Sequence, residues 1–302
     1  MSKLFMLCGL PASGKSTYAK ELSKQENANL HSSDNMRKIL FGDENVNDKN
    51  EEVFSMLHKQ IKLDLIDNKN VVYDATNINY KRRKAFLEEL KNINCEKICI
   101  LIATPYEKCL EQNKLRERQV PEEVIKKMYL NFYIPQYYEG WDKIRVEYNC
   151  DLNDFDLCEL FDSTDGLNYI NQDNPHHILT IGEHCSKCAM ELNKINKDCS
   201  MELFDAACLH DIGKRFTKEF KNYKGENTDI AHYYNHHLVS AYDSLFYADN
   251  DEDILLIANY IQWHMQPFFM ETEKAKNKFI NLIGQEFYDN LMILHQADLL
   301  AH

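Results

Sequence analysis

Short apolar runs alternate with charged, amphipathic segments along the first half of the chain. Strands are expected at 3–8 (KLFMLC), 70–77 (NVVYDATN) and 97–104 (KICILIAT), and NANLHSS (27–33) fits a further strand. Helices are expected from near Lys15, over 80–92, and from about 106 to 140 with breaks at Pro121 and Pro135. This alternation predicts an α/β domain with a parallel sheet and flanking helices over residues 1–150.

The second half has another pattern. Residues 148–175 are acidic, contain an Asp-Gly pair and end at Pro175, so we interpret 151–175 as a linker. Beyond it, apolar residues recur at helical spacing in five or more segments, without a comparable strand pattern. Residues 176–302 are therefore predicted to form an all-α domain.

Charge separates the same two halves. Residues 1–150 hold 24 Lys and Arg against 22 Asp and Glu, whereas residues 151–302 hold 11 against 26, and ten of the twelve histidines lie in the second half. The acidic half argues against broad, non-specific nucleic-acid binding. Ten cysteines, mostly within apolar segments, and the lack of a long apolar run predict a cytoplasmic protein without a membrane partner.

The segment GLPASGKST (9–17) matches the phosphate-binding pattern G-x-x-x-x-G-K-[ST] between a predicted strand and a predicted helix. Backbone amides of such a loop surround a phosphate chain, a lysine reaches the β and γ phosphates, and a hydroxyl binds Mg²⁺. The lysine here is Lys15, and Ser16 carries the hydroxyl. The residues expected to hold ATP and Mg²⁺ are Gly9, Ser13, Gly14, Lys15, Ser16 and Thr17.

With SSDNMR (32–37), VVYDATNINYKRR (71–83) and LEQNKLRERQVPEEVIKKM (110–128), this loop resembles the polynucleotide kinase branch of P-loop phosphotransferases over roughly residues 3–145. The resemblance implies that Asp34 is the general base and that Arg37 contacts the acceptor phosphate. It places Arg116, and with it Arg118, in a lid over the donor phosphates.

Simpler interpretations of these residues stay open. Asp34 also fits the cap of the following helix, and Arg116 and Arg118 also fit an exposed, charged helix face. Asp74 fits either a carboxylate that supports Mg²⁺ through water or an ordinary strand end. The patch Lys81, Arg82 and Arg83 fits either nucleic-acid phosphates or a solubilising helix face.

The second half carries the adjacent pair His210 and Asp211 in CLHDIGK, with other histidines and an aspartate on predicted helices. Imidazole and carboxylate suit transition metals that activate water, and a helical bundle can project them into one pocket. NPHHILTIGEHC, LHDIGK, HYYNHHLVSAYDS, IQWHM and ADLLAH resemble the HD-domain phosphohydrolases over about 174–302. The resemblance implies metal ligands His184, His210, Asp211 and Asp298, joined by His236 and His264 in two-metal members, with Asp211 bridging. It also implies that Lys214 faces a substrate phosphate, with His177 near the substrate.

Together the two halves predict a bifunctional enzyme that heals nucleic-acid ends, as in the bacterial HD-domain polynucleotide kinases that the chain resembles. ATP and Mg²⁺ would serve phosphorylation of a 5′-hydroxyl. One or two Mn²⁺, Fe²⁺, Co²⁺, Ni²⁺ or Zn²⁺ ions would serve removal of a 2′,3′-cyclic, 2′- or 3′-phosphate. RNA or DNA ends would be substrates, with a separate ligase as partner. Two alternatives stay open: a metabolite kinase fused to a nucleotide phosphohydrolase, and an ATP sensor that regulates the helical domain.

Overall fold

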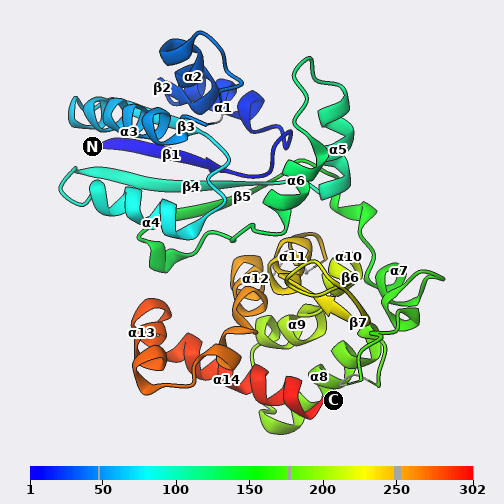
Figure 1. Ribbon diagram of the computed structural model, residues 1–302. Coiled ribbons are helices and arrows are strands. Elements are labelled where there is room, and N and C mark those ends of the chain that lie inside the picture. Colours follow the sequence, from blue (N-terminus) through cyan, green and yellow to red (C-terminus); the bar gives the residue numbers. More distant parts are fainter. Residues whose placement is uncertain (47, 176–177, 248–252, 302) are drawn as a thin grey trace. The chain divides into compact units, whose positions relative to one another are not determined.

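The computed structural model describes residues 1–46, 48–175, 178–247 and 253–301. The chain forms two compact units (Figure 1). The N-terminal unit comprises residues 1–128 and 135–150, and the C-terminal unit comprises residues 129–134 and 151–302. Within the described ranges, no helix combines the length and apolar character needed to cross a bilayer.

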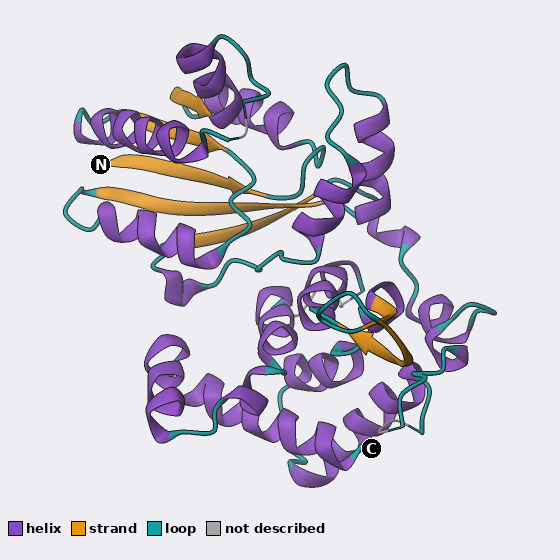
Figure 2. Ribbon diagram, in the orientation of Figure 1, coloured by secondary structure: helices purple, strands orange, loops and turns teal. Residues whose placement is uncertain are grey.

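The N-terminal unit is built on a five-stranded parallel sheet (Figure 2) with the order β2-β3-β1-β4-β5. Its strands are β1 (Ser2–Cys8), β2 (Ala28–Ser32), β3 (Asn70–Asp74), β4 (Cys95–Ala103) and β5 (Lys143–Tyr148). The expected strands are confirmed, whereas β5 was not foreseen. Because all strands are parallel, the loops after β1, β2 and β3 lie together at the carboxyl-terminal end of the sheet.

Helices flank both faces of this sheet. They are α1 (Lys15–Gln25), α2 (Ser33–Phe41), α3 (Asn50–Ile66), α4 (Tyr80–Glu89), α5 (Tyr106–Lys114) and α6 (Glu122–Tyr129), with a 3-10 turn η1 (Tyr137–Glu139). Ala19 and Leu22 of α1 pack on Phe5 and Val72. On the opposite face, the rings of His58 in α3 and Phe86 in α4 lie 4.1 Å apart. This arrangement confirms the α/β prediction for the N-terminal unit.

The C-terminal unit is mainly helical. Its α-helices are α7 (Leu157–Asp162), α8 (Ile181–Ile195), α9 (Met201–Leu209), α10 (Lys214–Thr217), α11 (His236–Asp243), α12 (Ile254–Trp263), α13 (Glu273–Ile283) and α14 (Gln285–Leu300). Its 3-10 turns are η2 (Leu152–Asp154), η3 (Leu167–Tyr169), η4 (Ser244–Phe246) and η5 (Gln266–Phe269). Helix α9 packs against α8, α12 and α14, and α11 packs against α12.

The second domain was expected to be all-α, but it also contains a β-hairpin. Strands β6 (Lys218–Lys221) and β7 (Asn227–Tyr233) form an antiparallel hairpin between α10 and α11. Most residues of both strands are exposed or half-buried. Sequence periodicity did not reveal the hairpin, because no buried apolar face imposes alternation on it.

Two segments differ from the expected domain organisation. Residues 151–175, expected as a linker, contain η2, α7 and η3 and cluster with the C-terminal unit. Residues 129–134, expected within the first domain, also cluster with that unit. Their anchors are aromatic and polar: the rings of Phe132 and Tyr242 lie 4.7 Å apart, and the Ile134 amide donates to Oε1 of Gln262 at 2.7 Å.

Candidate functional site

The loop between β1 and α1 is a cradle with little room for side chains. Gly14 has a φ of +89° and Ala12 a φ of +59°. A Cβ on Gly14 would lie 3.0 Å from Nδ2 of Asn149, and one on Gly9 would lie 2.9 Å from Oγ of Ser13. At Gly14 the left-handed backbone favours glycine, and at Gly9 the close approach of Ser13 does so. The turn brings backbone amides and the N-terminus of α1 to one place, which suits a phosphate chain.

Two polar side chains hold this loop from neighbouring strand ends. The carbonyl oxygen of Ser13 accepts hydrogen bonds from Oγ1 of Thr104 at 2.9 Å and from Nδ2 of Asn149 at 3.1 Å. Neither residue was predicted from the sequence. The available signal for Thr104 was its place at the end of KICILIAT, whereas Asn149 follows β5, whose strand pattern was not recognised.

Lys15 lies inside the cradle and is buried. Its ammonium group donates to the carbonyl oxygen of Leu10 and to Oγ of Ser13. Burial lowers the pKa of Lys15, and the nearby carboxylate of Asp74 works in the opposite direction. Burial raises the pKa of Asp74, while Lys15 and a hydrogen bond with Ser16 lower it. The carboxylate and the hydroxyl thus form the pair that suits Mg²⁺ beside a phosphate chain.

Asp34 lies at the start of α2, between two arginines. Its Oδ1 is 2.9 Å from Nη1 of Arg37, and its Oδ2 is 3.2 Å from Nη1 of Arg118. The helix is capped by Ser32, whose side chain accepts from the amide of Asn35. The alternative that Asp34 is the cap was therefore wrong. A carboxylate with two guanidinium groups at a strand end suits an incoming phosphorylated acceptor.

The two candidate lid arginines are not on a helix. Helix α5 ends at Lys114, and both Arg116 and Arg118 lie in the loop that follows. Arg118 reaches Asp34 and also donates to the carbonyl oxygen of Glu44 at 3.1 Å. Arg116 is exposed, and its charge adds to burial in lowering the pKa of Lys15. Arg118 is thus on the side of Asp34, whereas the charge of Arg116 acts on Lys15 in the cradle.

The basic patch at 81–83 does not present three free cations. Arg83 is 2% exposed and its guanidinium makes two hydrogen bonds of 2.7 Å to the carboxylate of Glu139. It also donates to the carbonyl oxygen of Asn77 at 2.7 Å. Arg83 therefore holds the loop after β3 in place, and the hypothesis that it contacts nucleic acid was wrong. Lys81 and Arg82 remain exposed.

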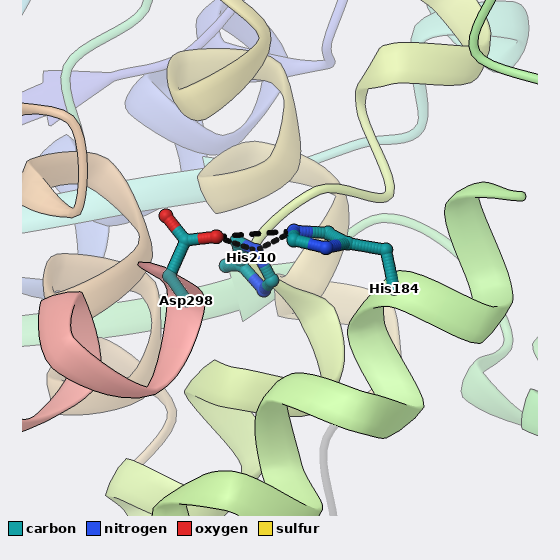
Figure 3. A group of neighbouring side chains, drawn as sticks. All are labelled: His184, His210 and Asp298. Carbon is teal, nitrogen blue, oxygen red and sulfur yellow. Dashed lines mark hydrogen bonds and ion pairs between the residues drawn. The ribbon is translucent and has the colours of Figure 1, made fainter. Parts of the chain in front are cut away.

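The C-terminal unit brings six histidine and aspartate side chains into two buried groups. One group is His184 (α8), His210 and Asp298 (α14), which point toward one another in Figure 3. The other is Asp211, His236 (α11) and His264. In each group, one ligand atom from every residue lies within 4.8 Å of the others. These are the six residues of the C-terminal unit that were predicted as metal ligands.

Asp211 faces both groups with different oxygen atoms. Oδ2 lies 3.3 Å from Nε2 of His184 and 3.5 Å from Nε2 of His210. Oδ1 lies 3.2 Å from Nε2 of His236 and 3.7 Å from Nε2 of His264. The carboxylate lies between the two groups, with one oxygen atom toward each.

The imidazoles expose the same nitrogen to the centre. Nδ1 of His210, His236 and His264 lies 2.7–2.8 Å from the carbonyl oxygens of Ala207, Tyr233 and Ile261. Nδ1 of His184 lies 3.4 Å from the carbonyl oxygen of Ala301. A carbonyl oxygen can only accept a hydrogen bond, so Nδ1 carries a proton, and in a neutral ring Nε2 then keeps its lone pair.

This arrangement fits divalent cations. The Nε2 atoms of His184 and His210 are 3.1 Å apart, and those of His236 and His264 are 3.2 Å apart. Two lone pairs this close need a positive charge between or beside them. Burial opposes charge on His184, yet hydrogen bonds with the carboxylates of Asp211 and Asp298 raise its pKa to about 9. A proton on His184 supplies this positive charge here, and a divalent metal ion between the nitrogen atoms would supply it as well.

Lys214 borders the same carboxylate. Its ammonium lies 2.6 Å from Oδ2 of Asp211 and donates to Oε1 of Gln172 at 2.8 Å. Burial raises the pKa of Asp211, but Lys214, His210 and the hydrogen bonds with other histidines hold that pKa well below its usual range. Lys214, which was predicted to face a substrate phosphate, thus lies beside Asp211 as a cation of the cluster. No sequence signal identified Gln172, and His177 lies outside the described residues.

The parallel sheet and the loop before α1 show that the N-terminal unit has an α/β P-loop fold. Residues 4–135 match the model of a family described as AAA domain. An L-seryl-tRNA(Sec) kinase of Methanococcus maripaludis is 26% identical over 250 residues, which cover 75% of this chain and 93% of that protein. Protein kti12 of Schizosaccharomyces pombe is 26% identical over 152 residues, or 46% of this chain, so the chain spans about half (54%) of that relative.

Solved structures similar to the chain include Kti12 of Chaetomium thermophilum in complex with ADP-AlF3. It is 20% identical, has a TM-score of 0.41, and the match covers 49% of this chain and 90% of that one. A chain of the Pnkp1/Rnl/Hen1 RNA repair complex is 25% identical with a TM-score of 0.36, and 42% of each chain is covered.

Proposed function

We propose that the chain is a bifunctional enzyme for nucleic-acid ends. One centre transfers phosphate from ATP to a 5′-hydroxyl, and the other removes a 2′,3′-cyclic, 2′- or 3′-phosphate by metal-dependent hydrolysis. The observation that carries the proposal is the bridging position of Asp211 between two buried histidine groups, in a chain that also holds a P-loop with Asp34 at a strand end. One centre adds phosphate and the other removes it.

In the transferase centre, the cradle amides and Lys15 hold the donor phosphates. Mg²⁺ beside Ser16 and Asp74 supplies charge neutralisation there when bound. The acceptor oxygen attacks the γ-phosphorus, the bond to the β–γ bridging oxygen breaks, and ADP leaves. Asp34 accepts the proton of the attacking hydroxyl. Arg37 and Arg118, which contact Asp34 in the structure, bind the phosphate adjacent to that hydroxyl.

In the hydrolytic centre, His184, His210, Asp298 and one oxygen of Asp211 would hold one cation. His236, His264 and the other oxygen of Asp211 would hold a second. Divalent ions bound there supply Lewis-acid polarisation of a phosphoryl group and activation of water. The carbonyl contacts of Nδ1 orient each imidazole, and Lys214 offers its ammonium to the phosphoryl oxygens. The donor set of imidazole and carboxylate suits Mn²⁺, Fe²⁺, Co²⁺, Ni²⁺ or Zn²⁺.

Support for a polymer acceptor comes from the aligned relative that acts as a kinase on L-seryl-tRNA(Sec), a hydroxyl attached to RNA. A length series tests the acceptor class. A labelled γ-phosphate from ATP is followed onto a 5′-hydroxyl oligonucleotide, onto the same oligonucleotide already 5′-phosphorylated, onto a nucleoside, and onto seryl-tRNA. We expect transfer to the 5′-hydroxyl oligonucleotide and far less to the nucleoside. Transfer to the nucleoside alone would favour the metabolite kinase.

The hydrolytic centre is tested with RNA that ends in a 2′,3′-cyclic phosphate, incubated with each candidate metal after chelation. We expect phosphate release or ring opening that requires a metal. Asp211→Asn should abolish this reaction and leave phosphoryl transfer intact, and Lys15→Ala should do the reverse. Loss of both activities in each variant would contradict the assignment of the two reactions to separate centres.

A further inference from the structure

The hairpin β6–β7 is attached at both ends to the cluster of histidines and aspartates. It begins directly after α10, which starts with Lys214, and β7 ends at Tyr233, three residues before His236. The carbonyl oxygen of Tyr233 accepts from Nδ1 of His236 at 2.8 Å. The ammonium of Lys214 lies 5.4 Å from the centroid of the Tyr233 ring. The hairpin is thus continuous with two residues of the proposed hydrolytic centre.

The base of the hairpin is fixed to the segment before α8. Lys218 forms an ion pair with Asp173 at 2.6 Å. The amide of Ala231 donates to the carbonyl oxygen of Asp173 at 2.9 Å, and Nδ2 of Asn174 donates to the carbonyl oxygen of Ala231 at 3.2 Å. These contacts hold the hairpin at its base, while its tip around Tyr223 is exposed.

Lysines gather in β6 and at the tip of the hairpin, within an acidic region. Residues 151–302 contain 11 Lys and Arg against 26 Asp and Glu, yet residues 218–224 contain three of those 11 and one acidic residue, Glu219, whereas Glu226 and Asp229 follow the tip. Lys221 and Lys224 are exposed. A basic segment of this kind, adjacent to a phosphate-handling centre, matches the charge of a polyanionic substrate.

Large aromatic side chains are exposed beside these lysines. Tyr223 at the tip is 80% exposed, Phe220 in β6 is 46% exposed, and Tyr234 after β7 is 40% exposed. The Lys224 ammonium lies 5.6 Å from the centroid of the Tyr223 ring. Exposed aromatic rings interleaved with lysines are the arrangement on which single-stranded nucleic acids bind, because bases stack on the rings and phosphates pair with the ammonium groups.

We infer that the hairpin surface, defined by Phe220, Lys221, Tyr223, Lys224 and Tyr234, binds the single-stranded segment that precedes a phosphorylated 3′ end. The inference rests on the proposed hydrolysis and names its substrate class: a polynucleotide rather than a mononucleotide. The seven residues of β7 extend about 20 Å at roughly 3.3 Å per residue, enough for more than one nucleotide. The terminal phosphate enters the cluster at Lys214 while upstream bases lie on the hairpin.

The test compares two substrates of the full chain loaded with its metal: an oligoribonucleotide and a mononucleotide, each ending in a 2′,3′-cyclic phosphate. In the double variant Phe220→Ala/Tyr223→Ala, we expect KM for the oligonucleotide to rise roughly tenfold or more, with kcat little changed. Both constants for the mononucleotide should stay as in the wild type. The matched control is Tyr137→Ala, which removes an exposed tyrosine of the N-terminal unit.

The lysines have a separate readout. In Lys221→Ala/Lys224→Ala, the dependence of oligonucleotide binding on salt should become shallower by about 1.4 in the slope of log K against log salt, the value for two lost phosphate contacts. The control Lys274→Ala/Lys278→Ala removes two exposed lysines of α13 and should leave the slope unchanged.

Two kinetic outcomes would overturn the inference: parallel changes for both substrates, or no change for either. Binding is measured independently of turnover by fluorescence anisotropy, with a single-stranded RNA that is phosphorylated at both ends. If the wild type hydrolyses neither substrate, the proposed hydrolysis fails, and this binding assay alone decides the inference. Equal affinity of wild type and Phe220→Ala/Tyr223→Ala for that RNA would then reject the hairpin surface as its binding site.

Discussion

The ammonium of Lys214 lies 2.6 Å from Oδ2 of Asp211, the same oxygen that faces Nε2 of His184 and Nε2 of His210. This oxygen therefore balances a fixed cation and faces the group of His184, while Oδ1 of the same carboxylate faces His236 and His264. In a metal-loaded centre, Lys214 and the metal ions repel each other, while both attract the phosphoryl oxygens. The two effects of Lys214 can be separated by experiment.

Lys214→Met should lower kcat/KM for phosphate removal by about 100-fold, in the range seen when one preorganised charge at a reaction centre is lost. Metal affinity should stay the same or rise, because a repelling ammonium is gone. Kinetics at saturating metal and a metal titration measure the two quantities. Lys194→Met, which removes an exposed lysine paired with Glu191, is the control. A large loss of metal affinity in Lys214→Met would show that the lysine organises Asp211 and does not bind substrate.

Metal stoichiometry should divide along the two groups. We expect the wild type to retain up to two transition-metal ions per chain, His184→Ala and His236→Ala each to lose one, and Asp211→Asn to lose both. Metal analysis of purified protein and the rise in Tm on adding Mn²⁺ are the measurements, since a ligand at 100 times its Kd adds about 2.7 kcal/mol of stability. His31→Ala is a matched control, because His31 also faces a carboxylate, Asp64, at 2.7 Å. Full retention by Asp211→Asn would exclude a bridging role.

The ion pair between Arg83 and Glu139 predicts a large effect on stability. Both side chains are at most 1% exposed, and Glu139 also accepts from Nε1 of Trp141 at 3.1 Å. Arg83→Met would leave the carboxylate buried without its cation, at a cost of about 3–5 kcal/mol. Urea unfolding of the N-terminal unit, followed by fluorescence, measures the change. Arg82→Met removes the exposed neighbour and should alter stability little; similar midpoints for the two variants would refute the structural role of Arg83.

Local sequence patterns predicted the buried strands of the N-terminal unit and the phosphate-binding loop between them and α1. Strands β1, β3 and β4 are continuous apolar runs, and the loop GLPASGKST joins β1 to α1. The six metal-ligand candidates came from the resemblance to HD-domain phosphohydrolases, since the spread of histidines along the chain does not select them, and the structure gathers them in two buried groups. Whether these residues bind metal is a prediction that the metal analysis tests.

Contacts between distant residues could not be predicted. Arg83 pairs with Glu139, 56 positions away, and nothing in the charged helix 80–92 marks Arg83, rather than the adjacent Arg82, as buried. The hairpin β6–β7 has no buried face, so its strands leave no period of two. The resemblance placed Arg116 first and Arg118 second as lid arginines, whereas the end of α5 at Lys114 and the course of the following loop bring Arg118 to Asp34.

Substitution of Asp34, which lies between Arg37 and Arg118, distinguishes the kinase hypothesis from the ATP-sensor alternative. If Asp34 accepts the proton of the attacking hydroxyl, Asp34→Asn should reduce phosphoryl transfer by roughly 100-fold or more and leave ATP affinity close to the wild-type value. Arg118→Ala should raise KM for the nucleic-acid acceptor more than KM for ATP, because its guanidinium is on the acceptor side. Arg116→Ala is the informative counterpart, since its charge acts on Lys15 and its loss should chiefly affect ATP.

Steady-state kinetics with both substrates varied, together with ATP binding by calorimetry, distinguish these cases. Asn at position 34 keeps the size of the side chain and removes its negative charge, so the two arginines lose an ion-pair partner without a cavity. A thermal melt of Asp34→Asn controls for misfolding. If Asp34→Asn binds ATP normally and transfers phosphate at the wild-type rate, Asp34 is not the base. If the wild type binds ATP but transfers phosphate to no acceptor of the length series, the result favours the ATP sensor over the kinase.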